Sequence, residues 1–265
     1  MKKIIFRIIA LTILAALAAG MVACGNGSIY DDLAKDGFTV KVRYEADGAV
    51  VNETQNVTIV EVFNADDKVT VNGKSGVALL DPSDTRRGEG VFKLAKTDGK
   101  NNYYLAGWYT SRTPRVGANG EALDAYGVPI ATSGREQGYV FSGKWDFEKD
   151  VVTSDMAVDG EFVLYAAWVP FFTYEFYATN ENGETELLGQ KNKLTLTLPK
   201  WNDRKEQYDM KDFPKEDGKV FAGAYLDEAM TREISVDLDG REYFIDYEKG
   251  IAAETTVKVY VKWAE

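Results

Sequence analysis

The chain has 265 residues, of which 31 are basic and 42 acidic, so its formal net charge is -11. Nucleic acid is not an expected partner, because phosphates require a basic face and this chain is acidic. The sequence contains no histidine, which removes serine-histidine and cysteine-histidine nucleophile pairs and the commonest zinc ligands. We therefore expect a protein that is not an enzyme and carries no cofactor.

The first 23 residues have the layout of a secretory signal. Lys2, Lys3 and Arg7 form a positive start, and an almost purely apolar stretch follows at 8–19. This stretch is too short to span a bilayer comfortably, because a transmembrane helix needs roughly 20 apolar residues. We predict that residues 1–23 are removed on export, which leaves 28 basic and 42 acidic residues and a net charge of -14.

The segment Met21-Val22-Ala23-Cys24 resembles a lipobox, the signal read by the bacterial lipoprotein pathway. The resemblance implies that Cys24 receives a diacylglyceryl group and becomes the first residue of the mature protein. Two acyl chains then hold the protein in membrane lipid, at about 0.8 kcal/mol per buried methylene. The expected location is the extracytoplasmic side of the bacterial membrane. The alternative is an ordinary secretory peptide followed by an unmodified cysteine.

Beyond a short tether at 24–37, the apolar pattern has a period of two, which predicts strands. Val257, Val259 and Val261 alternate with polar or amphipathic side chains, as in a half-buried antiparallel strand. The same alternation occurs at 38–44, 172–176 and 193–198. Pairs typical of turns separate the strands: Asp98-Gly99, Asn182-Gly183 and Asp239-Gly240. The fold class expected is all-β.

Three sequence blocks recur in the same order along the chain. Residues 162–168 align with 257–263, 105–109 align with 221–225, and 38–40 align with 172–174. Ordered self-similarity of this kind indicates a tandem duplication. We predict two small β-rich domains, at 38–169 and 170–265, joined by loops of unequal length.

These blocks resemble the Listeria-Bacteroides repeat, also met as the B repeat of internalin surface proteins. The matching elements are the turn at 44–48, Leu105-Ala106-Gly107-Trp108-Tyr109, Trp145-Asp146-Phe147 and the closing Leu164-Tyr165-Ala166-Ala167-Trp168. In the second copy Ala224 replaces the motif tryptophan. The resemblance implies a β-grasp-like fold, a place on the bacterial cell surface and no catalysis. It implies a role in binding, adhesion or presentation toward a protein or glycan that it does not identify.

The first copy is longer than the second, and we place its extra residues at 111–137. This stretch holds several Gly and Pro residues without an alternating apolar run, which predicts a surface loop. Four of its side chains are candidate ligand contacts: Arg112, Arg115, Tyr126 and Arg135. Arginine and tyrosine are enriched at binding hot spots. The alternative is an insertion without function, because long loops cost little entropy.

Two further features leave alternatives open. Trp108, Trp168 and Trp263 fit core packing, whereas Trp145 and Trp201 sit among polar neighbours and equally fit a carbohydrate-stacking surface. A chain with 42 acids can also place two carboxylates at hydrolytic distance. A carbohydrate-binding or weakly hydrolytic lipoprotein of a glycan-uptake system is therefore the alternative function.

One segment partly imitates a calcium-binding loop. Asp237, Asp239 and Asp246 fall at positions 3, 5 and 12 of the EF-hand spacing, although serine opens the loop and aspartate closes it. The same segment has a simpler interpretation, in which Asp239-Gly240 is a hairpin turn and 241–247 is a strand. We prefer the hairpin and expect no metal.

Overall fold

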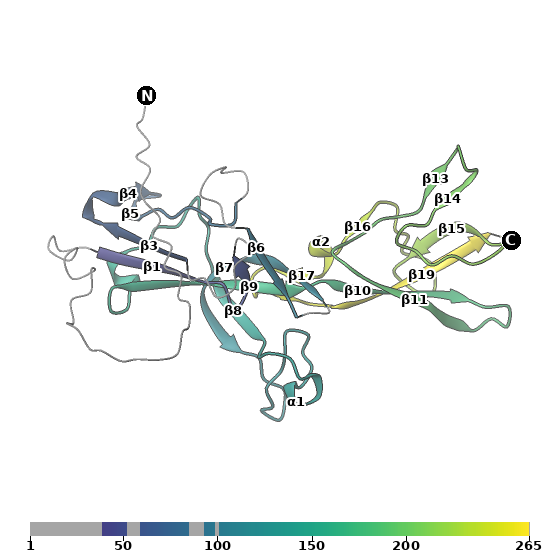
Figure 1. The fold of residues 1–265 in the computed structure, drawn as a ribbon, viewed down its shortest axis with the longest axis horizontal. Helices are drawn as coiled ribbons and strands as arrows, with labels where there is room; N and C mark the ends of the chain where they lie inside the picture. The colour runs from purple at the N-terminus through teal and green to yellow at the C-terminus, as the bar shows by residue number, and fades with distance from the viewer. Residues whose placement is uncertain (1–38, 52–58, 85–92, 99–100, 265) are drawn as a thin grey trace, which may run out of the picture. The chain divides into compact units, whose positions relative to one another are not determined.

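The computed structural model describes residues 39–51, 59–84, 93–98 and 101–264 (Figure 1). The chain is all-β, as predicted: strands dominate, and the α-helices among these residues are the short α1 (Ile130–Ser133) and α2 (Gly240–Phe244). Two single 3₁₀ turns lie at Ala65–Asp67 and Ser154–Met156. The predicted export signal, Cys24, the tether and Gly99 lie outside the described residues.

The described chain divides into two compact units. The first contains residues 39–97, 107–113 and 140–167, and the second contains 98–106, 114–139 and 168–264. Most of the stretch at 111–137 therefore belongs with the C-terminal residues. Independent folding of 38–169 and 170–265 stays a prediction.

The first unit is built on a sheet that has seven strands among the described residues, in the order β2-β6-β7-β9-β1-β3 with β8 beside β7. Its strands are β1 (Thr39–Glu45), β2 (Val50–Val51), β3 (Ile59–Asn64), β6 (Leu94–Thr97), β7 (Asn102–Pro114), β8 (Tyr139–Lys144) and β9 (Glu161–Pro170). The ends of β7 and β9 fall in the second unit. β1 forms an antiparallel pair with β3 and a parallel pair with β9.

Alternation along β1 places the core on one face of this sheet. Val40, Val42 and Tyr44 are buried, whereas the residues between them are half-buried and polar. On the polar face, Arg43 donates from Nε to a Glu161 carboxylate oxygen at 2.6 Å. On the core face, the Tyr44 ring meets the ring of Trp108 edge-on, with 5.4 Å between centroids.

The second unit is built on a sheet that has four strands among the described residues, in the order β11-β10-β19-β15 (Figure 1). The strands are β10 (Phe172–Thr179), β11 (Thr185–Lys193), β15 (Val220–Tyr225) and β19 (Thr256–Ala264). The buried face of β10 carries Phe172, Tyr174 and Phe176. It packs with the buried valines of β19, which are the valines that the sequence pattern assigns to the core.

Both sheets share one arrangement of strands. The first strand pairs antiparallel with the next long strand and parallel with the last: β1 with β3 and β9, and β10 with β11 and β19. The last strand is flanked on its other side by β7 in one sheet and β15 in the other. The three recurring sequence blocks lie on these corresponding strands.

Short two-stranded pairs extend the two units. β4 (Lys68–Val71) pairs with β5 (Lys74–Val77), and β13 (Lys200–Asn202) pairs with β14 (Gln207–Asp209). β12 (Thr195–Leu196) pairs with β16 (Leu238–Asp239), and β17 (Ile245–Asp246) pairs with β18 (Ile251–Ala252).

The predicted hairpin turn at Asp239-Gly240 is wrong, because these residues begin helix α2. The Asp239 carboxylate accepts the backbone N–H of Arg241 at 3.0 Å and so caps the helix. Gly240 is required by packing: a Cβ at this position would lie 2.2 Å from the Phe172 ring. The predicted strand at 241–247 is correspondingly reduced to the short β17.

Candidate functional site

The stretch predicted as a surface loop is folded around one buried acid, Asp124. One Asp124 carboxylate oxygen accepts the backbone N–H groups of Tyr126 and Val128, each at 2.9 Å, and the other faces Arg135 at 3.1 Å. Burial alone would raise the pKa of this carboxyl. The hydrogen bonds from Val128, Arg135, Ser133 and Tyr126 outweigh burial and hold the pKa below its usual value.

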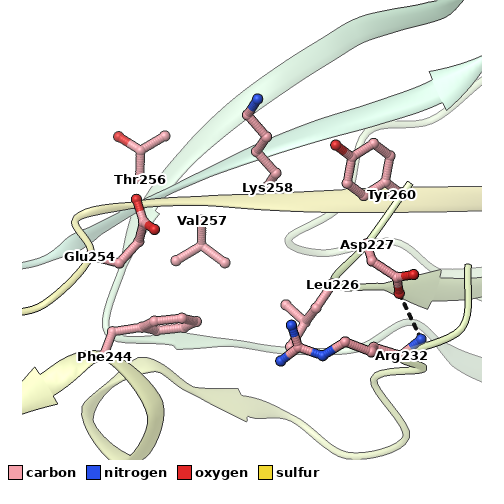
Figure 2. A pocket seen from close by; sticks show the side chains of 9 residues that line it. All are labelled: Leu226, Asp227, Arg232, Phe244, Glu254, Thr256, Val257, Lys258 and Tyr260. Atoms are coloured by element: carbon pink, nitrogen blue, oxygen red, sulfur yellow. Dashed lines mark hydrogen bonds between the residues drawn. The ribbon is translucent and has the colours of Figure 1, made fainter. Parts of the chain in front are cut away.

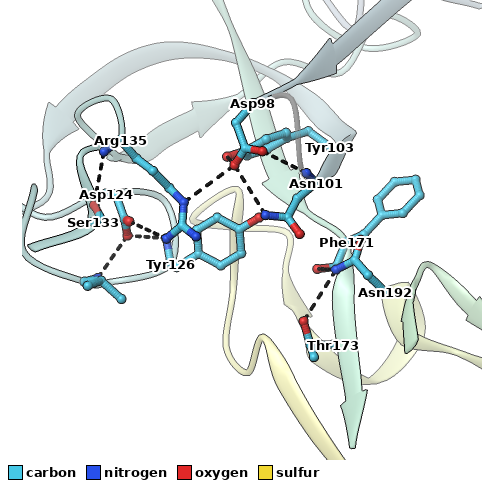
Figure 3. A network of polar contacts seen from close by, with 11 residues as sticks. Asp98, Asn101, Tyr103, Asp124, Tyr126, Ser133, Arg135, Phe171, Thr173 and Asn192 are labelled. Carbon is cyan, nitrogen blue, oxygen red and sulfur yellow. Dashed lines mark hydrogen bonds and ion pairs between the residues drawn. The ribbon is translucent and has the colours of Figure 1, made fainter. Parts of the chain in front are cut away.

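Arg135 and Tyr126 form a polar cluster with Asp98, which precedes β7, and with Tyr103 of β7 (Figure 3). The Arg135 guanidinium lies 4.5 Å from the centre of the Tyr126 ring and 3.6 Å from the Asp98 carboxylate. Tyr103 meets Tyr126 edge-on at 6.3 Å and donates its hydroxyl to Asp98 at 3.2 Å. Burial raises the pKa of the Tyr126 phenol to about 12, so the ring stays neutral at physiological pH.

The other two candidate contacts also have internal partners. Arg112 pairs with Asp47 at 3.0 Å, and its guanidinium lies 4.8 Å from the centre of the Tyr165 ring. Arg115 donates to the carbonyl of Ala125 at 2.6 Å. The structure thus gives Arg112, Arg115, Tyr126 and Arg135 partners within their own units. Their role in ligand binding stays a prediction.

The three acids of the calcium-like segment have separate partners. Asp237 accepts the backbone N–H of Leu198, Asp239 pairs with Arg241, and Asp246 accepts from Lys249 at 2.8 Å. Within the part of the chain that the structure describes, no cluster of three or more His, Cys, Asp or Glu side chains could hold a metal ion.

An open pocket of about 310 Å³ lies beside β19 in the second unit (Figure 2). Leu226, Phe244 and Val257 supply apolar surface, and Arg232 and Glu254 supply charge. Asp227, the other acid that lines the pocket, is hydrogen-bonded within its own turn, because its carboxylate accepts the backbone N–H of Arg232 at 2.6 Å.

The two ambiguous tryptophans have different surroundings. Trp145 is buried, packs its ring 5.1 Å from that of Phe162, and belongs to the core of the first unit. Trp201 lies on hairpin β13–β14 and is 51% exposed. Of these two residues, only Trp201 keeps the exposure that a stacking surface requires.

Two acids that the sequence did not single out are central to the packing. Asp47 lies in the turn after β1 and accepts from both Lys96 and Arg112. Asp212 is 5% exposed and accepts from Lys193 and from the backbone N–H of Thr197. The only sequence signal was the Asp47-Gly48 turn motif, because the partners of both acids come from distant strands.

Comparisons with known proteins add no assignment. No family model matches the chain, and neither the curated proteins nor the solved structures yield a match. Within residues 39–51, 59–84, 93–98 and 101–264, no helix has the length and apolarity needed to cross a membrane.

Proposed function

We propose that this chain is a lipid-anchored, extracytoplasmic surface protein that binds or presents without catalysis at the bacterial envelope. Cys24, after its signal-like segment, supplies the anchor through two acyl chains. The observation that carries the binding role is the shared strand arrangement of the two sheets. Repetition of one small β unit multiplies exposed surface without creating an enclosed active site.

The same arrangement supports a finer assignment, which is a tandem of two β-grasp-like repeats. In each sheet the last strand lies parallel to the first, between it and a strand that carries the Gly-aromatic block. Phe162–Trp168 and Val257–Trp263 would then be equivalent closing strands. The duplication accounts for the recurrence of tyrosine and tryptophan at matching positions, Tyr165 with Tyr260 and Trp168 with Trp263.

The aspartates with a shifted pKa do not have the property expected of a glycosidase acid. A glycosidase acid needs a raised pKa, so that it holds a proton to donate near neutral pH. The described aspartates whose pKa departs from the usual value all shift downward: Asp124, Asp146, Asp155, Asp212, Asp227, Asp239 and Asp246. Glycan binding without hydrolysis is the second candidate function, and the exposed indole of Trp201 favours it.

Substitution of Cys24→Ser tests the anchor. The wild-type chain should sediment with membranes and resist a high-salt wash, whereas the variant should be released or accumulate with its signal uncleaved. Protease added to intact cells or to spheroplasts should digest the anchored protein if it faces outward. Unchanged membrane partition of the variant would contradict acylation, and protection from protease in both preparations would contradict the extracytoplasmic location.

A further inference from the structure

Hairpin β13–β14 presents an aromatic side chain in an unusual setting. Among the described tryptophans, Trp108, Trp145 and Trp168 are buried and Trp263 is half-buried, whereas Trp201 is 51% exposed. Trp201 is thus the most exposed of these tryptophans, and the outer part of its indole is open to a ligand.

The indole is held in place by a series of rings that leads into the core. Trp201 meets Tyr208, its cross-strand neighbour, edge-on at 5.2 Å, and Tyr208 meets Phe221 at 5.5 Å. Phe213 lies 5.7 Å from Phe221 and 4.9 Å from the fully buried Phe176. We call these five residues the aromatic ladder. Because the ladder fixes its outer end, a ligand need not restrict Trp201 on binding, which lowers the entropic cost.

The surroundings of Trp201 on the hairpin are polar. The four side chains of the turn are charged and exposed: Asp203, Arg204, Lys205 and Glu206. The turn that displays them is ordered, since Asn202 accepts the backbone N–H of Arg204 at 3.1 Å. Next to the ladder, Val220 is exposed, but it precedes Phe221 in β15 and so points to the opposite face of the strand.

The polar surroundings of Trp201 favour a sugar over a protein as the ligand of this hairpin. A protein partner that buries an aromatic hot spot normally surrounds it with further contacts that exclude water, and protein-binding patches cover several hundred Å² of apolar surface. A sugar ring has different needs: its C–H groups stack on one aromatic face, while hydroxyls at its edge bond to charged and amide side chains. One fixed indole beside the carboxylate and cationic groups of the turn fits the sugar.

We infer that hairpin β13–β14 is a glycan-binding site in which Trp201 stacks on a sugar ring. Exposed charged groups of the adjoining turn, among them Asp203 and Arg204, bond to the sugar hydroxyls. This inference rests on the proposed function, because it names the class of ligand that the surface protein binds. It does not involve the stretch at 111–137.

Binding to defined polysaccharides tests the inference. The full chain, solubilised in mild detergent, is incubated with insoluble cellulose, xylan, starch, mannan, chitin and peptidoglycan, and with soluble forms in affinity electrophoresis. The wild type should bind at least one of them. Trp201→Ala should bind about tenfold more weakly, which corresponds to about 1.4 kcal/mol for one aromatic contact. Trp201→Phe should bind with intermediate strength.

Tyr243→Ala is the matched control, because Tyr243 is a 57% exposed aromatic residue on α2, outside the hairpin. It should bind as the wild type does. Acrylamide quenching of tryptophan fluorescence gives a second measurement: the polysaccharide should shield the accessible fluorophore in the wild type, and Trp201→Phe should lack that fluorophore. This readout does not depend on how well Trp201→Ala folds.

Several outcomes would overturn the inference while leaving the proposed function intact. Equal binding by wild type and Trp201→Ala would move the glycan site elsewhere. A wild type that binds none of the polysaccharides would exclude a glycan of these classes. Reversible self-association that is lost in Trp201→Ala, without polysaccharide binding, would show that a second copy of the chain covers the indole. Failure of the proposed function would instead appear as loss of membrane anchoring or outward exposure.

Discussion

Asp124 keeps its charge where solvent hardly reaches it. Its side chain is 1% exposed, yet two backbone N–H groups and the Arg135 guanidinium point at its carboxylate. A buried carboxylate is tolerated only when its hydrogen-bonding capacity is met in this way. The segment around it therefore depends on one side chain rather than on a hydrophobic core.

Replacing Asp124→Asn should destabilise the second unit. The amide keeps the size of the side chain but loses the ion pair with Arg135, at an expected cost on the order of 3 kcal/mol. Thermal and urea unfolding at neutral pH measure the loss. Asp146→Asn is the control, because Asp146 pairs with Lys149 at the surface and its change should have little effect. Equal effects of the two substitutions would contradict the importance of burial.

The pH dependence follows from the lowered pKa of Asp124 in the folded state. A carboxyl with a depressed pKa contributes its stability fully above the unfolded value of about 3.9 and loses it as the pH falls through the folded value. The difference in free energy of unfolding between wild type and Asp124→Asn should be constant near neutrality and shrink below about pH 4. A constant difference down to pH 2 would exclude this linkage.

For single side chains, the sequence identified candidate contact residues but not the residues with which they pair. Arg112, Arg115, Tyr126 and Arg135 stood out because they lie on an acidic chain in a stretch rich in Gly and Pro. Their partners were hidden because pairing depends on folding: Asp47 is 65 residues from Arg112 along the chain.

At the scale of structural elements, Gly138 connects two separate parts of the stretch at 111–137 through its backbone hydrogen bonds. Gly138 donates to the carbonyl of Leu123 and accepts from the N–H of Arg115, each at 2.8 Å. A Cβ on Gly138 would lie 2.4 Å from the backbone of Asp124. Gly138→Ala should therefore force the backbone segments at Gly138 and Asp124 apart and lower stability by about 1–3 kcal/mol, the usual range for overpacking.

Gly189→Ala is the matched control for that substitution. Gly189 lies in β11 and has no left-handed φ, and a Cβ added to it would meet no atom beyond its chain neighbours within 4 Å. The melting temperature of this variant should be unchanged or slightly raised, because alanine restricts the unfolded chain. Should both glycine variants melt alike, close packing at Gly138 would not be the cause.

Local sequence signals predicted the long strands well and the short elements poorly. Period-two alternation located β1, β10 and β19, because one buried face imposes that period over many residues. The sequence pattern failed at α2, because Asp239-Gly240 is suited both to a hairpin turn and to the start of a helix. The close packing of Gly240 under Phe172, which is distant in sequence, is not visible in the local pattern.

For the whole molecule, the proposed duplication predicts that residues 38–169 and 170–265 each fold alone. Each fragment should show β-type circular dichroism and a cooperative melt. The fragment 170–265 should melt at a lower temperature than in the full chain, because the second unit also contains 98–106 and 114–139. It loses, for example, the bond from the Phe171 N–H to the Asn102 carbonyl at 2.9 Å. Two unfolded fragments beside a stable full chain would contradict the duplication boundary.

The parallel pairing of first and last strands also determines when each sheet can close. Lys41 pairs with Glu161 and Thr173 pairs with Thr256, so a central strand of each sheet is among the last parts to be synthesised. Until that last strand is synthesised, β1 can pair with β3 and β10 can pair with β11. Two paired strands alone are barely stable in water. Distant pairings also form slowly. Late closure of this kind would suit the export proposed above, because a chain that is still unfolded is narrow enough to be threaded through a secretion channel.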